Sequence, residues 1–240
     1  MSTAVKLPPD PSRLIEGLRD TGYDFNTALA DIVDNSVDAM ATTVRLGIRM
    51  DFEGDITVSV ADNGHGMDRD ALLNAMTYGA KSKKQKSALG KFGLGLKTAS
   101  TAFCRRLSVV TREKDGEVLK ATWDLNHVEK TGEWEVLLDK PRKDEVALLD
   151  ETAEGGAGTV VIWEEVDRLL KDYENPTGQP AKNALKKIAA GFGEHASMVY
   201  QRFLDHEDKR ARNIEMVIND AAVEGWDPFC KKNDKAELVA

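Results

Sequence analysis

The sequence has few cysteines, few aromatic residues and no long hydrophobic run. Its two cysteines, Cys104 and Cys230, lie far apart without metal-ligand spacing, which argues against a disulfide scaffold or a zinc site and favours a reducing, cytoplasmic location. No apolar stretch approaches the roughly 18 residues of a membrane helix, and the polar N-terminus is unlike a signal peptide, so no membrane partner is expected. The net charge of −8 argues against a dedicated DNA-binding module within this chain.

The composition is typical of a globular protein. The 240 residues are 41% hydrophobic and 31% charged, which is enough to build the core of one large domain, or of one domain and part of another. A helix is predicted over 25–40, because Leu29, Ile32, Val33 and Val37 recur at helical spacing. Similar patterns predict further helices near 12–19, 68–76, 94–103 and 181–204, a β-hairpin of strands 44–50 and 56–60, and strands at 106–112, 117–125, 134–138, 159–164 and 214–218. The acidic, turn-rich section 139–158 is expected to be surface.

The 25–40 helix carries a face of short, oxygen-bearing side chains. At about 100° per residue, Asp31, Asn35 and Asp38 fall in one sector opposite the apolar stripe. The ordinary interpretation is a solvated polar face. The face lacks long Lys and Glu side chains, however, and asparagine is a mediocre helix former. Magnesium prefers such hard oxygen ligands, so this face is a candidate metal site.

The second segment, 62–67, has the sequence DNGHGM and follows a strand. It delivers the Asp62 carboxylate at the strand's end, where it can accept a hydrogen bond from an adenine amino group. Gly64 and Gly66 would let a base approach the backbone closely, and Met67 would pack on the purine ring. An ordinary Asn-Gly turn is the competing interpretation.

The third segment is a glycine-rich loop that leads into a helix. Gly90, Gly93 and Gly95 precede the helix start, where free backbone N–H groups can bind phosphate. The segment is neither a P-loop nor the start of a Rossmann unit. From 79 to 97 the chain has six lysines and no acid, which indicates either a solvated charge run or a lid beside a phosphate site.

With these three segments in this order, the chain resembles the ATPase superfamily of gyrase, heat-shock chaperones, histidine kinases and MutL (GHKL). The stretch ALADIVDNSVDA at 28–39 is most similar to the MORC and MutL-like branch. The resemblance covers residues 10–165. It implies an α/β fold of Bergerat type, a two-layer sandwich of a mixed, largely antiparallel sheet with helices on one face.

The resemblance also implies roles for individual residues. Asn35 would bind Mg²⁺, Asp62 the adenine of ATP, and the hydroxyl of Thr159 would support the Asp62 carboxylate. Asp31 occupies the position of the catalytic general base, which is usually a glutamate. The shorter aspartate can hold the attacking water less well, so slow turnover is expected. The full set of expected nucleotide-binding residues is Asn35, Asp38, Asp62, Gly64, Gly66, Met67, Lys83, Gly90, Lys91, Phe92, Gly93, Leu94, Gly95, Leu96, Lys97 and Thr159.

The resemblance further suggests how the chain is organised. Residues 1–180 would form the ATP-binding domain with a lid at 77–96, and 181–240 a connecting helix and the truncated start of a transducer-like second domain. A longer parent protein would form an ATP-dependent homodimer and contact DNA through regions outside this chain. A non-hydrolysing nucleotide sensor or dimerisation module is the alternative. A histidine kinase is less favoured, because no histidine precedes Asp31.

Overall fold

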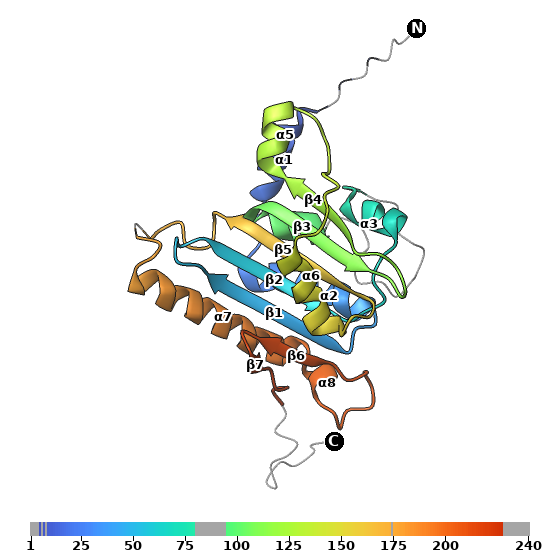
Figure 1. The fold of residues 1–240 in the computed structure, drawn as a ribbon. Coiled ribbons are helices and arrows are strands. Elements are labelled where there is room, and N and C mark those ends of the chain that lie inside the picture. Colours follow the sequence, from blue (N-terminus) through green and yellow to red (C-terminus); the bar gives the residue numbers. More distant parts are fainter. Residues whose placement is uncertain (1–4, 6, 8, 80–94, 174, 228–240) are drawn as a thin grey trace.

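The computed structural model describes residues 5, 7, 9–79, 95–173 and 175–227 (Figure 1). The elements follow the chain in the order α1 (Pro11–Arg19), α2 (Phe25–Asp38), β1 (Thr43–Met50), β2 (Ile56–Asp62), α3 (Arg69–Met76), α4 (Gly95–Thr101), β3 (Cys104–Arg112), β4 (Leu119–Asp124), α5 (Leu125–Thr131), α6 (Lys143–Ala153), β5 (Gly158–Val166), α7 (Gln179–Val199), α8 (Gln201–Leu204), β6 (Glu215–Ile218) and β7 (Ala221–Ala222).

The described strands form one seven-stranded sheet in the order β4-β3-β5-β2-β1-β6-β7. The predicted hairpin is present, with β1 antiparallel to β2. Within the described sheet β6 runs parallel to β1, and the other neighbours are antiparallel. In the β2–β5 pair, Asp62 lies opposite Thr159. The sheet therefore brings the end of β2 and the start of β5 together at the same end of the sheet.

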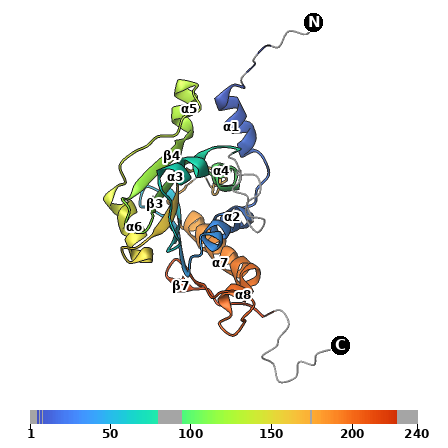
Figure 2. The same cartoon turned by 90° about the vertical axis from the view of Figure 1, so that its right-hand side faces the viewer.

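The main core lies between the sheet and the layer formed by α2, α4 and α7 (Figure 2). The apolar stripe of α2 makes the central contact, since Leu29, Ile32 and Val33 are buried. This architecture confirms the predicted α/β fold with its mixed, largely antiparallel sheet.

The opposite face of the sheet is covered by α6, where the sequence had predicted turn-rich surface. That prediction was wrong: α6 packs on β5, β2 and β3, and Leu149 joins Val110, Val160 and Ile162 in a second, smaller core. Figure 2 shows α6 on one side of the sheet and α2 and α7 on the other.

Two smaller differences lie between β4 and α6. The expected strand at 134–138 is reduced to one bridge, between Thr122 and Leu137. Helix α5 was not predicted; the Asp124 side chain caps its start, and Gly132, at φ 68°, ends it.

The described part of 181–240 is built onto the same sheet. Helix α7 packs on α2 and β1, and β6 extends the sheet beside β1. The division into two domains stays a prediction. No helix within the described residues is long and apolar enough to cross a membrane.

Candidate functional site

Asp31 is half-buried on α2, close to the start of α4. The Tyr23 hydroxyl donates a hydrogen bond of 3.0 Å to its Oδ2. A Cβ added to Gly95 would lie 3.6 Å from the same oxygen. The fold thus places the candidate general base beside Gly95, the residue at which the glycine-rich segment enters its helix.

Asn35 is exposed one turn after Asp31. Its Nδ2 donates a 2.8 Å hydrogen bond to the Asp31 carbonyl oxygen. Because the amide nitrogen is held by its own helix, Oδ1 is the atom presented to a ligand. One exposed amide oxygen suits Mg²⁺, which takes few protein ligands and completes its shell with water and phosphate oxygens. Among the described residues, no group of three or more acidic, histidine or cysteine side chains is arranged to hold a metal ion. Asp38 is exposed at the last turn of α2.

Asp62 ends β2 with its side chain buried, at 4% exposure. Its Oδ2 accepts a 2.8 Å hydrogen bond from the Ser36 hydroxyl, and its Oδ1 accepts one of 2.8 Å from the Gly64 backbone N–H. Burial raises the pKa of Asp62, while these two hydrogen bonds act in the opposite direction. Ser36 lies on α2, so it ties the second segment to the first.

The two glycines of the second segment are required by backbone packing. A Cβ on Gly64 would lie 2.7 Å from the Cβ and the carbonyl oxygen of Ala39. Gly66 has φ +67°, and a Cβ there would fall 1.9 Å from the Arg112 carbonyl oxygen. In the structure, these two glycines approach the backbone of Ala39 and of Arg112 closely. This close approach holds the turn after Asp62 against α2 and β3.

Thr111, which was not predicted as a site residue, connects Thr159 with Met67. The Thr111 hydroxyl lies 2.9 Å from the Thr159 hydroxyl and accepts a 3.0 Å hydrogen bond from the Met67 backbone N–H. Among the described residues, the Ser36 side chain donates a hydrogen bond to the Asp62 carboxylate. Any support from the Thr159 hydroxyl stays a prediction.

Lys97 is buried, at 2% exposure. Its Nζ donates a 2.8 Å hydrogen bond to the Ala75 carbonyl oxygen and lies 5.8 Å from the centre of the Tyr78 ring. Burial lowers the pKa of Lys97 to about 8. This lysine therefore joins α4 to the end of α3. Its expected contact with phosphate stays a prediction.

The remaining phosphate-loop residues are mostly outside the part of the chain that the structure describes. Leu96 is half-buried against the main core. The residues that lie outside the described ranges are Lys83, Gly90, Lys91, Phe92, Gly93 and Leu94.

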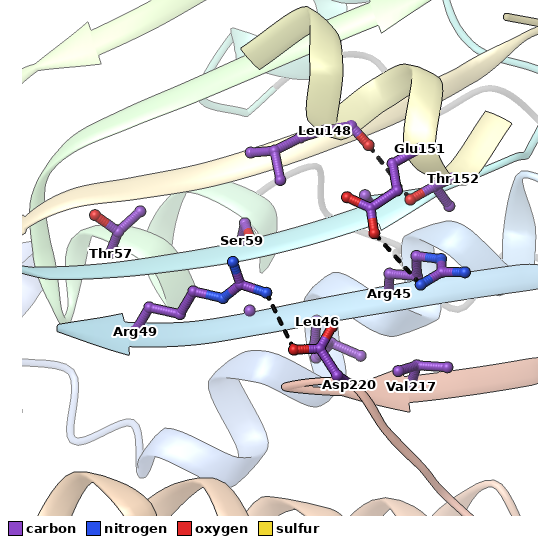
Figure 3. A pocket seen from close by; sticks show the side chains of 12 residues that line it. Arg45, Leu46, Arg49, Thr57, Ser59, Leu148, Glu151, Thr152, Val217 and Asp220 are labelled. Carbon is purple, nitrogen blue, oxygen red and sulfur yellow. Dashed lines mark hydrogen bonds and ion pairs between the residues drawn. The ribbon is translucent and has the colours of Figure 1, made fainter. Parts of the chain in front are cut away.

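A separate hollow of about 150 Å³ lies on the α6 face of the sheet (Figure 3). Two ion pairs cross it, Arg45 with Glu151 at 3.6 Å and Arg49 with Asp220 at 3.5 Å. Figure 3 shows the arginines leaving β1 on the side that faces α6. The nucleotide-site candidates do not line this hollow.

Comparisons with known proteins show to which proteins this chain is similar. The family model described as histidine kinase-, DNA gyrase B-, and HSP90-like ATPase matches residues 23–159. Protein MICRORCHIDIA 6 of Arabidopsis thaliana is 24% identical over 212 residues, covering 82% of this chain and 30% of that protein. ATPase morc-1 of Caenorhabditis elegans is 36% identical over 90 residues, covering 38% of this chain and 10% of that protein.

A third relative comes from the mismatch-repair proteins. DNA mismatch repair protein MutL of Methanocorpusculum labreanum is 36% identical over 95 residues, which cover 37% of this chain and 16% of that protein. The chain therefore spans about a third or less of the length of the curated relatives that it matches.

Proposed function

This chain belongs to the histidine kinase-, DNA gyrase B- and HSP90-like ATPase family, and from that premise we propose that it is a magnesium-dependent ATP-binding domain that hydrolyses ATP slowly. The observation that carries the proposal is the arrangement around α2. Ser36 on one side of the helix holds the buried Asp62 carboxylate, and Asp31 lies against Gly95. One helix thus borders both the proposed adenine position and the proposed phosphate position.

In the proposed reaction, Asp31 acts as the general base. The oxygen of a water molecule forms a bond to the γ-phosphorus, and the bond between that phosphorus and the β,γ-bridging oxygen breaks. The water proton passes to the Asp31 carboxylate, and ADP leaves with inorganic phosphate. Asp31 must lie within hydrogen-bond reach of that water, and its position beside Gly95 supports this role.

Mg²⁺ would be held by the Asn35 amide oxygen and would neutralise phosphate charge. We expect Asn35→Ala to remove most of the magnesium dependence of ATP binding. Titration calorimetry with and without excess EDTA measures it. Asn26→Ala removes another amide from the same helix, and it should retain the full magnesium dependence. A magnesium dependence unchanged in Asn35→Ala would assign the ion to other residues.

Asp62 provides the sharpest test of nucleotide binding. A buried carboxylate accepts from the amino group of adenine but repels the carbonyl oxygen of guanine, so the native chain should prefer ATP to GTP. Losing a buried hydrogen-bond partner costs about 1–3 kcal/mol, and more for a charged group. Asp62→Asn should therefore weaken ATP binding at least about tenfold in calorimetry.

The control for this test is Asp55→Asn, which changes an exposed carboxylate in the turn between β1 and β2. It should leave ATP affinity unchanged. Equal affinity of the native chain for ATP and GTP would remove Asp62 from the adenine site.

Three parts of the proposal concern a longer protein, of which this chain would be one part. Nucleotide would draw the lysine-rich segment 77–96 over the phosphates, and the closed form would dimerise. The parent would use this cycle as a clamp in DNA-associated work, through regions outside this chain. The similarity to a mismatch-repair MutL protein supports this part.

A further inference from the structure

Two tyrosine hydroxyls hold carboxylates on α2, in different settings. The Tyr23 hydroxyl, two residues before the helix begins, donates to Asp31 Oδ2 at 3.0 Å. The Tyr200 hydroxyl, at the end of α7, donates to Asp34 Oδ1 at 2.8 Å and to the Ala30 carbonyl oxygen at 3.0 Å. Asp31 lies against Gly95, and Asp34 is turned toward α7.

We propose that Tyr23 is a positioning residue for ATP hydrolysis, whose hydroxyl fixes the Asp31 carboxylate in the orientation that activates water. The inference rests on the proposed function, because it requires Asp31 to be the general base. It assigns Tyr23 a role through Asp31 and not through contact with ATP.

The geometry of Asp31 explains why such a residue is needed. The oxygen that accepts from Tyr23 is also the one that faces Gly95. With Oδ2 held by Tyr23, rotation of the carboxylate is restricted, and Oδ1 would be the oxygen that accepts the proton of the water molecule. The short Asp31 side chain has few conformations in which it could reach that water. Small errors in the position of a general base reduce the reaction rate strongly.

Tyr23 is suited to this role by its own surroundings. Its ring packs against the main core, and this packing restricts the position of the hydroxyl group. Burial, together with the nearby Asp31, raises the pKa of the Tyr23 phenol, so the group remains a donor at physiological pH. A phenol holds the carboxylate without adding a positive charge, whereas an arginine in its place would reduce the basicity of Asp31.

A helix-capping role does not account for the Tyr23 bond. The start of α2 is already capped by Asp24, whose Oδ1 accepts from the backbone N–H groups of Asn26 and Thr27. The Tyr23–Asp31 bond spans eight residues and ends on a half-exposed side chain. Its position is beside the phosphate end of the site.

The test compares Tyr23→Phe with Tyr200→Phe in the full-length protein. Each variant removes one oxygen atom that donates to a carboxylate of α2. We expect Tyr23→Phe to lower the single-turnover hydrolysis rate about tenfold, as the loss of one oriented hydrogen bond would, with the ATP dissociation constant within twofold of wild type. Tyr200→Phe should lower the unfolding midpoint and leave the hydrolysis rate unchanged.

The Asp31→Asn variant distinguishes a failure of the role proposed for Tyr23 from a failure of the role proposed for Asp31. If Tyr23 acts through Asp31, the Tyr23→Phe/Asp31→Asn double variant should be no slower than Asp31→Asn alone. Wild-type turnover in Tyr23→Phe, or additive losses in the double variant, would overturn the inference while Asp31 keeps its role. Unchanged turnover in Asp31→Asn would reject both the proposed base and the inference.

Discussion

Replacing Asp31 by asparagine should lower the hydrolysis rate by about 10²–10⁴-fold, the usual contribution of a general base. Asparagine has nearly the same shape, and its oxygen can still accept from the Tyr23 hydroxyl. It cannot take the proton of the attacking water at neutral pH. The ATP dissociation constant should change less than about threefold, because only the reacting water loses its partner. Single-turnover measurement with labelled ATP on the full-length protein separates binding from chemistry.

Asp34→Asn is the matched control, since it changes a carboxylate three residues away that contacts Tyr200. It should alter stability and leave the hydrolysis rate near wild type. Asp31→Glu tests the length of the base: faster turnover would show that the short aspartate limits the rate. Unchanged turnover in both Asp31 variants would mean that the base lies elsewhere, whereas absence of turnover in the wild-type protein would favour the non-hydrolysing nucleotide sensor.

The parts of the fold with strong periodicity were predictable from the sequence. The apolar stripe of α2 and the alternating strands β1 and β2 depend on local spacing, which sequence displays directly. The positions of Asp31 and Asp62 on those elements followed. The hydrogen bond from Ser36 to Asp62 was not predicted, because it connects residues 26 positions apart and depends on how α2 packs on the sheet.

The supporting hydroxyl groups were missed for a related reason. Ser36, Thr111 and Tyr23 acquire their roles only from the side chains that tertiary packing places beside them. One signal was available for Ser36: it follows Asn35 directly, on the side of the helix that turns toward the core.

The surface prediction for 139–158 failed because it was based on the acidic residues and turn signals of that section. One of them, Glu145, is fully buried in α6, where its carboxylate accepts from the Lys120 Nζ at 2.7 Å and from the Arg142 backbone N–H at 2.7 Å. The buried positions of α6 recur at helical spacing, but two of the four, Glu145 and Thr152, are polar. An apolar stripe therefore does not stand out in the sequence, and the cover on this face of the sheet was missed.

This buried pair leads to the largest expected effect on stability. Lys120 and Glu145 are 3% and 0% exposed at their side chains, so removing one partner leaves the other charge in a site that water cannot reach. Glu145→Ala should lower the free energy of unfolding by about 3–5 kcal/mol, measured by urea denaturation. Glu151→Ala, in the same helix, breaks the 3.6 Å ion pair between Glu151 and Arg45, in which the Glu151 side chain is 60% exposed. This variant should lower the free energy of unfolding by at most about 1 kcal/mol.

The double variant Lys120→Met/Glu145→Leu distinguishes loss of the pair from loss of the helix packing. It removes both charges and keeps apolar volume. Because the attraction within a buried pair roughly offsets the cost of desolvating it, the free energy of unfolding should fall only by the lost hydrogen bond from the Arg142 N–H, about 1 kcal/mol. A loss as large as that of Glu145→Ala would mean that the pair itself holds α6 to the sheet. A Glu145→Ala cost no larger than that of Glu151→Ala would mean that water or a neighbouring carboxylate takes over the Lys120 charge. Because α6 packs on β2 and β5, whose ends carry Asp62 and Thr159, ATP affinity measured in the same variants would report whether this face supports the nucleotide site.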